Sequence, residues 1–324
     1  MDITHIVQPQ STASKTDPAD VIMWSSSTPS SSASQPHPGQ GQPTTTSHCF
    51  NTPAFPGPLL VVDRDHDREG NGDRQRTLLP AAHTRTALLL IDIQRGLNTS
   101  NGYFGSDRAT PTLEGNVATL LSRCREYNAR VAEMNSTTTT TTTTSAYPIQ
   151  MIHVFHQSSN PASPLHVSGR AQKDGIEFMP CAAPDDSSAF ETVLAKRANS
   201  AFADGRLKRL LAEKRIGQLV VVGIATDHCV SSSVRWAKDL GVVKRDWDRA
   251  LHHGGGGGGG GMAIGETEAE MDNEGTIVVV RDATACFGKG GVGAEMVQRV
   301  SLASLEGEFA DLLCTADVLD ELFG

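Results

Sequence analysis

A cysteine lies where an apolar run gives way to a helical pattern. The run Leu219–Val222 is rich in β-branched residues and predicts a buried strand, which Gly223 ends. Thr226 or Asp227 is the expected N-cap of a helix whose apolar period continues from Cys229 onward. Free backbone N–H groups and the positive helix dipole at such a turn lower the pKa of a thiol and can hold an oxyanion. The sequence therefore predicts a nucleophilic cysteine, with an inert buried thiol as the alternative.

Two charged residues end other predicted strands. Asp92 closes the apolar run Thr86–Ile91, and Lys196 closes a shorter candidate strand at 190–195. A carboxylate beside a thiol can take its proton and return it to a departing amine. An ammonium near both groups favours the thiolate and the carboxylate. Taken singly, the two residues could be a strand-end carboxylate and a solvated lysine, but together with Cys229 they indicate a nucleophile, its acid/base and a cation.

These residues are positioned by strands that alternate with helices. Strands are expected at 86–92, 149–155, 190–195, 218–223 and 276–280, with a last one before the C-terminal helix. Helices are expected at 113–134, 204–214, 229–240 and 292–305. Such alternation predicts an α/β fold with a doubly wound parallel sheet in a three-layer α/β/α arrangement. In that fold, ligands bind at the carboxyl ends of the strands, where the three candidates lie.

Composition divides the chain and limits its partners. Residues 1–80 form a Ser/Thr/Pro-rich tail that cannot bury a core, so we expect disorder there and a folded domain at 81–324. Low-complexity insertions are expected near 135–146 and 244–275. The formal net charge of -9 argues against nucleic acid or a membrane as a partner. No apolar run could span a bilayer, and the six scattered cysteines fit a reducing compartment, so a cytoplasmic protein is expected.

Three motifs resemble those of the isochorismatase-like cysteine hydrolases, a superfamily that includes nicotinamidases and streptothricin-hydrolase-like amidases. The motifs are Leu90–Gln94, Lys196–Phe202 and Gly223–Val230, and the resemblance runs from residue 86 to about 322. It implies the isochorismatase-like fold and a triad of Asp92, Lys196 and Cys229. It also implies a cis peptide between Ile224 and Ala225, with the N–H groups of Ala225 and Cys229 as the oxyanion hole.

Four further residues are the expected substrate-binding side chains, namely Gln94, His156, Asn199 and Phe202. For His156, a hydrogen-bonded histidine at a strand end is an equal alternative. His153 and His156 lie three apart on a strand, so their side chains point to opposite faces and do not form the metal site of nicotinamidases. No metal and no cofactor are therefore expected.

Two other motifs could be mistaken for sites. The segment Gly288–Gly293 looks like part of a phosphate-binding loop, but it lacks the closing Lys-Ser/Thr pair and precedes Glu295. The pair His252 and His253 has no further ligands nearby in the sequence and is expected in a solvated loop.

The resemblance predicts a cysteine hydrolase that cleaves the C–N bond of a small amide, cyclic amides included. True isochorismatases lack the nucleophilic cysteine, so hydrolysis of a vinyl ether is the lesser expectation. The alternatives are an isochorismatase or nicotinamidase activity, or a catalytically silent binding or scaffold protein on the same fold. A homo-oligomer is left open.

Overall fold

Six apolar segments form one parallel sheet in the computed structural model, which describes residues 77–98, 102–105, 107–137, 146–247 and 273–324. The expected tail up to residue 76, the threonine tract at 138–145 and residues 248–272, which include His252 and His253, lie outside the described residues. The strands are β1 (Thr86–Ile91), β2 (Gln150–His156), β3 (Glu191–Lys196), β4 (Gln218–Ile224), β5 (Thr276–Ala285) and β6 (Asp311–Leu313).

The sheet has the strand order β3-β2-β1-β4-β5-β6, and every pair of neighbours is parallel. The chain runs outward from β1 to β3 and then returns to place β4 on the other side of β1. This reversal makes the gap between the carboxyl ends of β1 and β4 the topological switch point, where open α/β sheets bind ligands. The expected doubly wound parallel sheet is confirmed.

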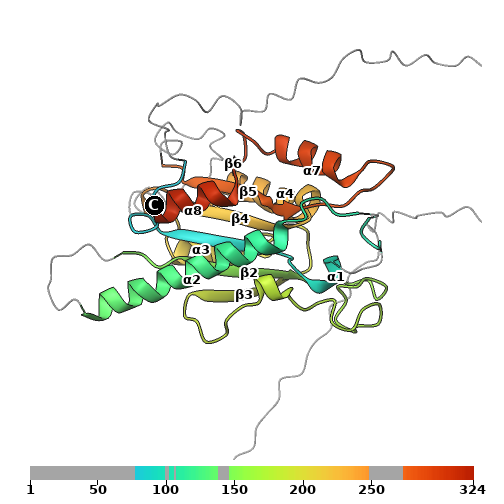
Figure 1. Ribbon diagram of the computed structural model, residues 1–324, viewed down its shortest axis with the longest axis horizontal. Helices are drawn as coiled ribbons and strands as arrows, with labels where there is room; N and C mark the ends of the chain where they lie inside the picture. The colour runs from blue at the N-terminus through green and yellow to red at the C-terminus, as the bar shows by residue number, and fades with distance from the viewer. Residues whose placement is uncertain (1–76, 99–101, 106, 138–145, 248–272) are drawn as a thin grey trace, which may run out of the picture. The chain divides into compact units, whose positions relative to one another are not determined.

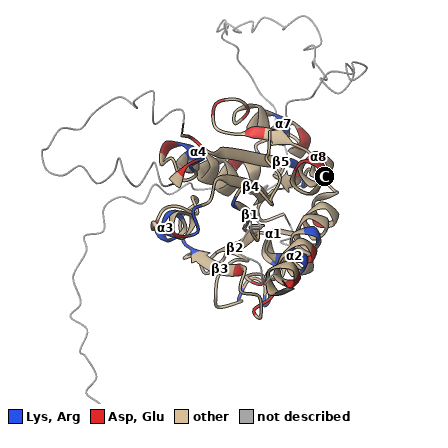
Figure 2. Ribbon diagram, turned by 90° about the vertical axis from the view of Figure 1, so that its left-hand side faces the viewer, with Lys and Arg blue, Asp and Glu red and all other residues tan. Residues whose placement is uncertain are grey.

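Helices cover both faces of the sheet (Figure 1). They are α1 (Arg95–Asn98), α2 (Leu113–Thr137), α3 (Arg206–Glu213), α4 (Ser231–Asp239), α7 (Ala294–Ala303) and α8 (Thr315–Phe323), with single turns η1 (Pro180–Ala182) and η2 (Thr226–Val230). Charged residues lie on α2, α3 and α4, which surround the largely uncharged sheet (Figure 2). No helix among the described residues is long and apolar enough to cross a membrane.

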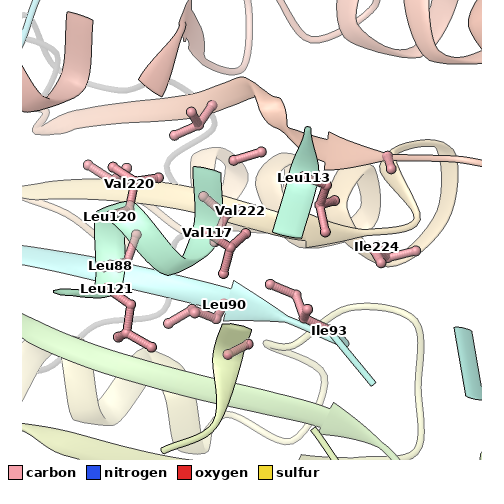
Figure 3. Close-up of a cluster of buried hydrophobic side chains, with 14 of the residues drawn as sticks. Leu88, Leu90, Ile93, Leu113, Val117, Leu120, Leu121, Val220, Val222 and Ile224 are labelled. Carbon is pink, nitrogen blue, oxygen red and sulfur yellow. The ribbon is translucent and has the colours of Figure 1, made fainter. Parts of the chain in front are cut away.

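Two cores result, because successive residues of a strand point to opposite faces. On one face, α2 and α8 pack against β1, β4 and β5; on the other, α3 and α4 do so. Figure 3 shows the first core, in which α2 presents apolar residues at helical spacing to alternate residues of the two central strands. These labelled side chains are Leu113, Val117, Leu120 and Leu121 from α2, Leu88 and Leu90 from β1, and Val220 and Val222 from β4.

Two expected boundaries change, and the described ends of the second expected insertion are joined to each other. The folded part already includes residues 77–80, because Leu78 is fully buried and its N–H donates to Glu321 Oε2 at 2.7 Å. Helix α2 extends to Thr137, into the first expected insertion. The second insertion is anchored at its described ends, where Arg245 N–H donates to Asn273 O at 3.0 Å. This anchor adjoins the start of β5, at the amino ends of the strands and so at the opposite end of the sheet from the switch point.

Candidate active site

The three residues predicted to do chemistry meet at the switch point. Asp92 follows β1, Lys196 is the last residue of β3, and Cys229 lies in η2, directly after β4. Lys196 Nζ lies 2.7 Å from Asp92 Oδ2 and 3.1 Å from Cys229 Sγ. The ammonium also donates to the carbonyl of Ala198 at 3.1 Å. A nucleophile, a carboxylate and a cation thus form one contiguous cluster.

Backbone conformation brings the carboxylate into this cluster. Asp92 has a φ of 52°, in the left-handed region, which aspartate tolerates better than most residues. Its N–H donates to Val154 O and its carbonyl accepts from Gln94 N–H, both at 2.8 Å. These bonds fix a tight turn at the end of β1, so Asp92 leaves the alternation of the strand.

Close contact between the central strands requires a glycine. Gly223 has a φ of 148°, and a Cβ atom on it would lie 2.3 Å from the carbonyl oxygen of Ile91. A side chain there would push β4 away from β1. Gly223 therefore keeps the strand ends that carry Asp92 and Cys229 adjacent.

Burial and charge set the protonation states of the cluster. Burial alone lowers the pKa of Lys196, but the attraction of Asp92 and Cys229 outweighs it and raises the pKa, so the ammonium stays charged. Burial, followed by the charge and the hydrogen bond of Asp92, raises the pKa of the Cys229 thiol, although Lys196 opposes this. The expected lowering of the thiol pKa by the helix terminus is therefore wrong. The resting thiol holds its proton, and Asp92 is the adjacent acceptor.

The turn that carries the nucleophile differs from the expected helix N-terminus. It is one turn of π-helix, η2, and the N–H groups of His228 and Val230 both donate to Ala225 O, at 3.0 and 3.2 Å. The expected N-cap at Thr226 or Asp227 is wrong, because Thr226 Oγ1 bonds Gln298 at 2.7 Å and Asp227 pairs with Lys289. The expected cis peptide between Ile224 and Ala225 is present.

A pocket of about 120 Å³ opens beside the cluster. Its walls are mostly apolar and come from the carboxyl ends of strands β1 to β5 and the loops that follow them. The lining residues are Asp92, Leu97, Phe104, His156, Leu165, Asn199, Ile224, Ala225, His228, Cys229, Phe287 and Lys289. Both residues expected to form the oxyanion hole, Ala225 and Cys229, are among them.

Two of the four predicted substrate-binding residues line this pocket. His156 and Asn199 do so, and His156 Nδ1 lies 3.4 Å from Lys196 Nζ. Burial and then the charge of Lys196 lower the pKa of His156, so its ring is neutral. Since the ring is neutral, Nδ1 can accept a hydrogen bond from the ammonium.

Gln94 and Phe202 lie elsewhere, which corrects their expected role. Gln94 is buried, with Oε1 accepting from His156 N–H at 2.8 Å and Nε2 donating to His156 O at 3.1 Å and to Ile176 O at 2.9 Å. Its amide therefore fixes the end of β2 and an adjacent loop. Phe202 is 2% exposed and packs in the core beneath α3. Both residues belong to motifs of the family that the chain resembles. Membership of a motif does not distinguish a residue that supports the fold from one that contacts substrate.

Several lining residues were not predicted from the sequence. Phe104 and Phe287 form aromatic walls, and His228 precedes the nucleophile. Lys289 belongs to the glycine-rich segment that resembles a phosphate-binding loop but lacks its closing residues. Their common signal is position, since each lies in a connection that leaves the carboxyl end of a strand. In the described part of the chain, no group of three or more His, Cys, Asp or Glu residues is arranged to hold a metal ion.

Comparison with known proteins agrees with this arrangement. The family model for the isochorismatase domain matches residues 86–244. The uncharacterized isochorismatase family protein YrdC of Bacillus subtilis is 23% identical over 242 residues, which are 73% of this chain and 96% of the relative. These matches support the isochorismatase family for this chain. YddQ, a second uncharacterized family protein of the same organism, is 28% identical over 162 residues, 49% of this chain and 72% of the relative.

A crystal structure supports the same assignment for the fold. A candidate hydrolase of the isochorismatase family from Chromobacterium violaceum superposes with a TM-score of 0.53 at 26% identity, covering 76% of this chain and 96% of that one. By family and fold, the chain is an isochorismatase-family hydrolase.

Proposed function

We propose that this isochorismatase-like protein hydrolyses the C–N bond of a small amide through a thioester on Cys229. The observation that carries the proposal is the position of Lys196 Nζ, within 2.7 Å of Asp92 Oδ2 and 3.1 Å of Cys229 Sγ. A buried ammonium that contacts both groups can stabilise the carboxylate before proton transfer and the thiolate after it.

The proposed reaction begins with transfer of the thiol proton to Asp92. The sulfur attacks the amide carbonyl, and the N–H groups of Ala225 and Cys229 hold the oxyanion. Asp92 then gives the proton to the leaving nitrogen, so ammonia or an amine departs and a thioester remains. Asp92 next takes a proton from water, which attacks the thioester, and the acid is released as the thiol re-forms. One amide and one water yield one acid and one amine.

The raised pKa of the Cys229 thiol gives the carboxylate its role. Because the thiol is protonated at rest, its attack needs a neighbouring group that accepts the thiol proton. Asp92 is the carboxylate beside the thiol. A reaction without metal is part of the proposal, with the oxyanion hole replacing a Lewis acid. The same pocket without chemistry would make a binding protein, which the following assay distinguishes.

The test is release of ammonia from a panel of small primary amides. The wild type, Cys229→Ala and Asp92→Asn are compared, with Cys181→Ala as the matched control at a partly exposed thiol outside the pocket. We expect turnover by the wild type and the control, and a loss of at least about 10³-fold in the other two variants. Turnover that survives Cys229→Ala would exclude the thioester route. Stoichiometric binding of an amide without turnover would favour the binding protein.

A further inference from the structure

A second ion pair lies at the pocket, apart from the proposed triad. Lys289 Nζ lies 2.6 Å from Asp227 Oδ2, and Lys289 lines the pocket. Asp227 is two residues before Cys229, and its side chain is 16% exposed. His228 Nε2 lies 3.6 Å from the same carboxylate oxygen. A cation on a pocket wall is thus paired with an anion of the turn that carries the nucleophile.

The backbone fixes this lysine in place. Lys289 and Val292 exchange N–H···O bonds of 3.0 Å each across the two-residue turn of Gly290 and Gly291. Both glycines have positive φ values, 59° and 80°, as a type I′ hairpin turn requires. The preceding residue, Gly288, donates to Asp107 O at 3.0 Å. The side chain of Lys289 therefore projects from a hydrogen-bonded hairpin. Its ion pair with Asp227 joins the segment after β5 to η2.

The charges around the pocket cancel. Lys196 is paired with Asp92, and Lys289 is paired with Asp227. The pKa of His156 is lowered by burial and then by Lys196. The pKa of His228 is lowered by burial, which outweighs the opposing charge of Asp227, and Lys289 acts in the same direction as burial. Both rings are therefore neutral near pH 7. The remaining walls are largely apolar, with Leu97 and Phe287 among them. Transfer of an ion into such surroundings is costly without a partner of its own.

We propose that the Lys289–Asp227 ion pair sets the charge selectivity of the pocket and makes it specific for compact, uncharged amides. This rests on the proposed function in one respect, that Cys229 is the attacking group. The volume of about 120 Å³ is small beside the roughly 300–1,000 Å³ of typical ligand pockets, which favours a compact substrate. The ammonium of Lys289 has three protons, so it can pair with Asp227 and still donate to a neutral acceptor on the substrate.

Two alkylating reagents of nearly equal size read out this selectivity without any turnover. Iodoacetamide is neutral and iodoacetate is anionic; with either, the sulfur of Cys229 forms a bond to the CH₂ carbon, iodide departs, and the thiol proton passes to Asp92 and then to solvent. Peptide mapping follows the labelling of Cys229 by each reagent over time. The measured quantity is the ratio of the two second-order rate constants at this residue. Dividing it by the same ratio for N-acetylcysteine removes the intrinsic difference between the reagents.

Neutralising one partner at a time should move this ratio in opposite directions. Asp227→Asn leaves the ammonium unpaired, so the ratio should shift about tenfold toward iodoacetate. Lys289→Met leaves the carboxylate unpaired, so the ratio should shift about tenfold toward iodoacetamide. The matched control is Lys238→Met, which breaks a 2.7 Å ion pair with Glu274 near the amino end of β5, and it should leave the ratio unchanged.

The outcomes separate this inference from the proposed function. Labelling of Cys229 with ratios that stay within twofold of the wild type in both variants would overturn the inference and leave the nucleophile intact. Folded wild type whose Cys229 reacts with neither reagent would overturn the nucleophile and this inference with it. Melting temperatures of the variants identify any loss of folding, and either variant alone decides the direction of the shift.

Discussion

Replacing Lys196 with methionine tests the centre of the site through stability as well as activity. The ammonium lies 2.7 Å from Asp92 Oδ2, and the two side chains are 5% and 1% exposed. At that separation, an effective dielectric constant of about 20 gives a Coulomb attraction of about 6 kcal/mol, part of which repays desolvation. Methionine keeps an apolar stem of similar length but leaves a buried carboxylate alone. We expect the free energy of unfolding to fall by about 3–5 kcal/mol.

The assay is urea unfolding of four proteins in a double-mutant cycle, namely the wild type, Lys196→Met, Asp92→Asn and the double variant. A loss of about 3–5 kcal/mol corresponds to a fall in melting temperature of roughly 6–20 °C for a domain of this size. The double variant should be more stable than Lys196→Met, because it holds no unpaired buried charge. A loss below about 1 kcal/mol in Lys196→Met, or strictly additive effects, would refute the description of a tightly coupled buried pair.

Four further predictions address the scaffold and the chemistry. Gly223→Ala should cost at least about 2 kcal/mol in urea unfolding, because its Cβ would meet the Ile91 carbonyl, whereas Gly115→Ala, in open space on α2, should stabilise by up to about 1 kcal/mol. Burial raises the pKa of Cys124 from 9.0 to about 12, so its contribution is complete below pH 9 and is lost as pH rises toward 12. The wild type should therefore lose about 1.4 kcal/mol more per pH unit than Cys124→Ala in that window, and parallel pH profiles would contradict this. Dialysis against EDTA should leave amide hydrolysis unchanged, and activity lost together with one equivalent of metal would exclude the metal-free route. A chain lacking residues 1–70 should keep its melting temperature and its labelling at Cys229, and insolubility would show that this segment belongs to the domain.

Sequence reasoning worked best where a local pattern repeats. Buried parallel strands read as continuous apolar runs, so β1 and β4 could be located to within a residue, together with the residues at their ends. Asp92, Lys196 and Cys229 could be placed at one edge because parallel strands share the direction of their carboxyl ends. That they touch depends on the strand order, which no local pattern gives, and the triad itself was implied by the resemblance.

The remaining features depend on tertiary contacts that no local pattern encodes. The pKa of Cys229 follows from burial beside a carboxylate 137 positions earlier in the chain, whereas the sequence around Cys229 indicates only the local helix dipole. Gln94 was expected to bind substrate as part of the motif Leu90–Gln94, yet its partners are backbone groups of β2 and of a loop. Lys289 was assessed only for phosphate, since its pairing with Asp227 depends on how the segment after β5 packs on η2.

Lys196 is the last residue of β3, and β3 is the outermost strand at one end of the sheet, paired with β2 alone. Edge elements open in local fluctuations that cost less than global unfolding. The cation of the site therefore lies on one of the parts of the sheet that should fray first, while Asp92 and Cys229 follow its central strands. Catalytic competence should then be lost at urea concentrations where the central strands still protect their amides from hydrogen exchange. The rate of hydrolysis in urea would therefore depend on whether β3 remains paired with β2. A partner that binds β3 would allow hydrolysis to continue at higher urea concentrations without contacting the substrate.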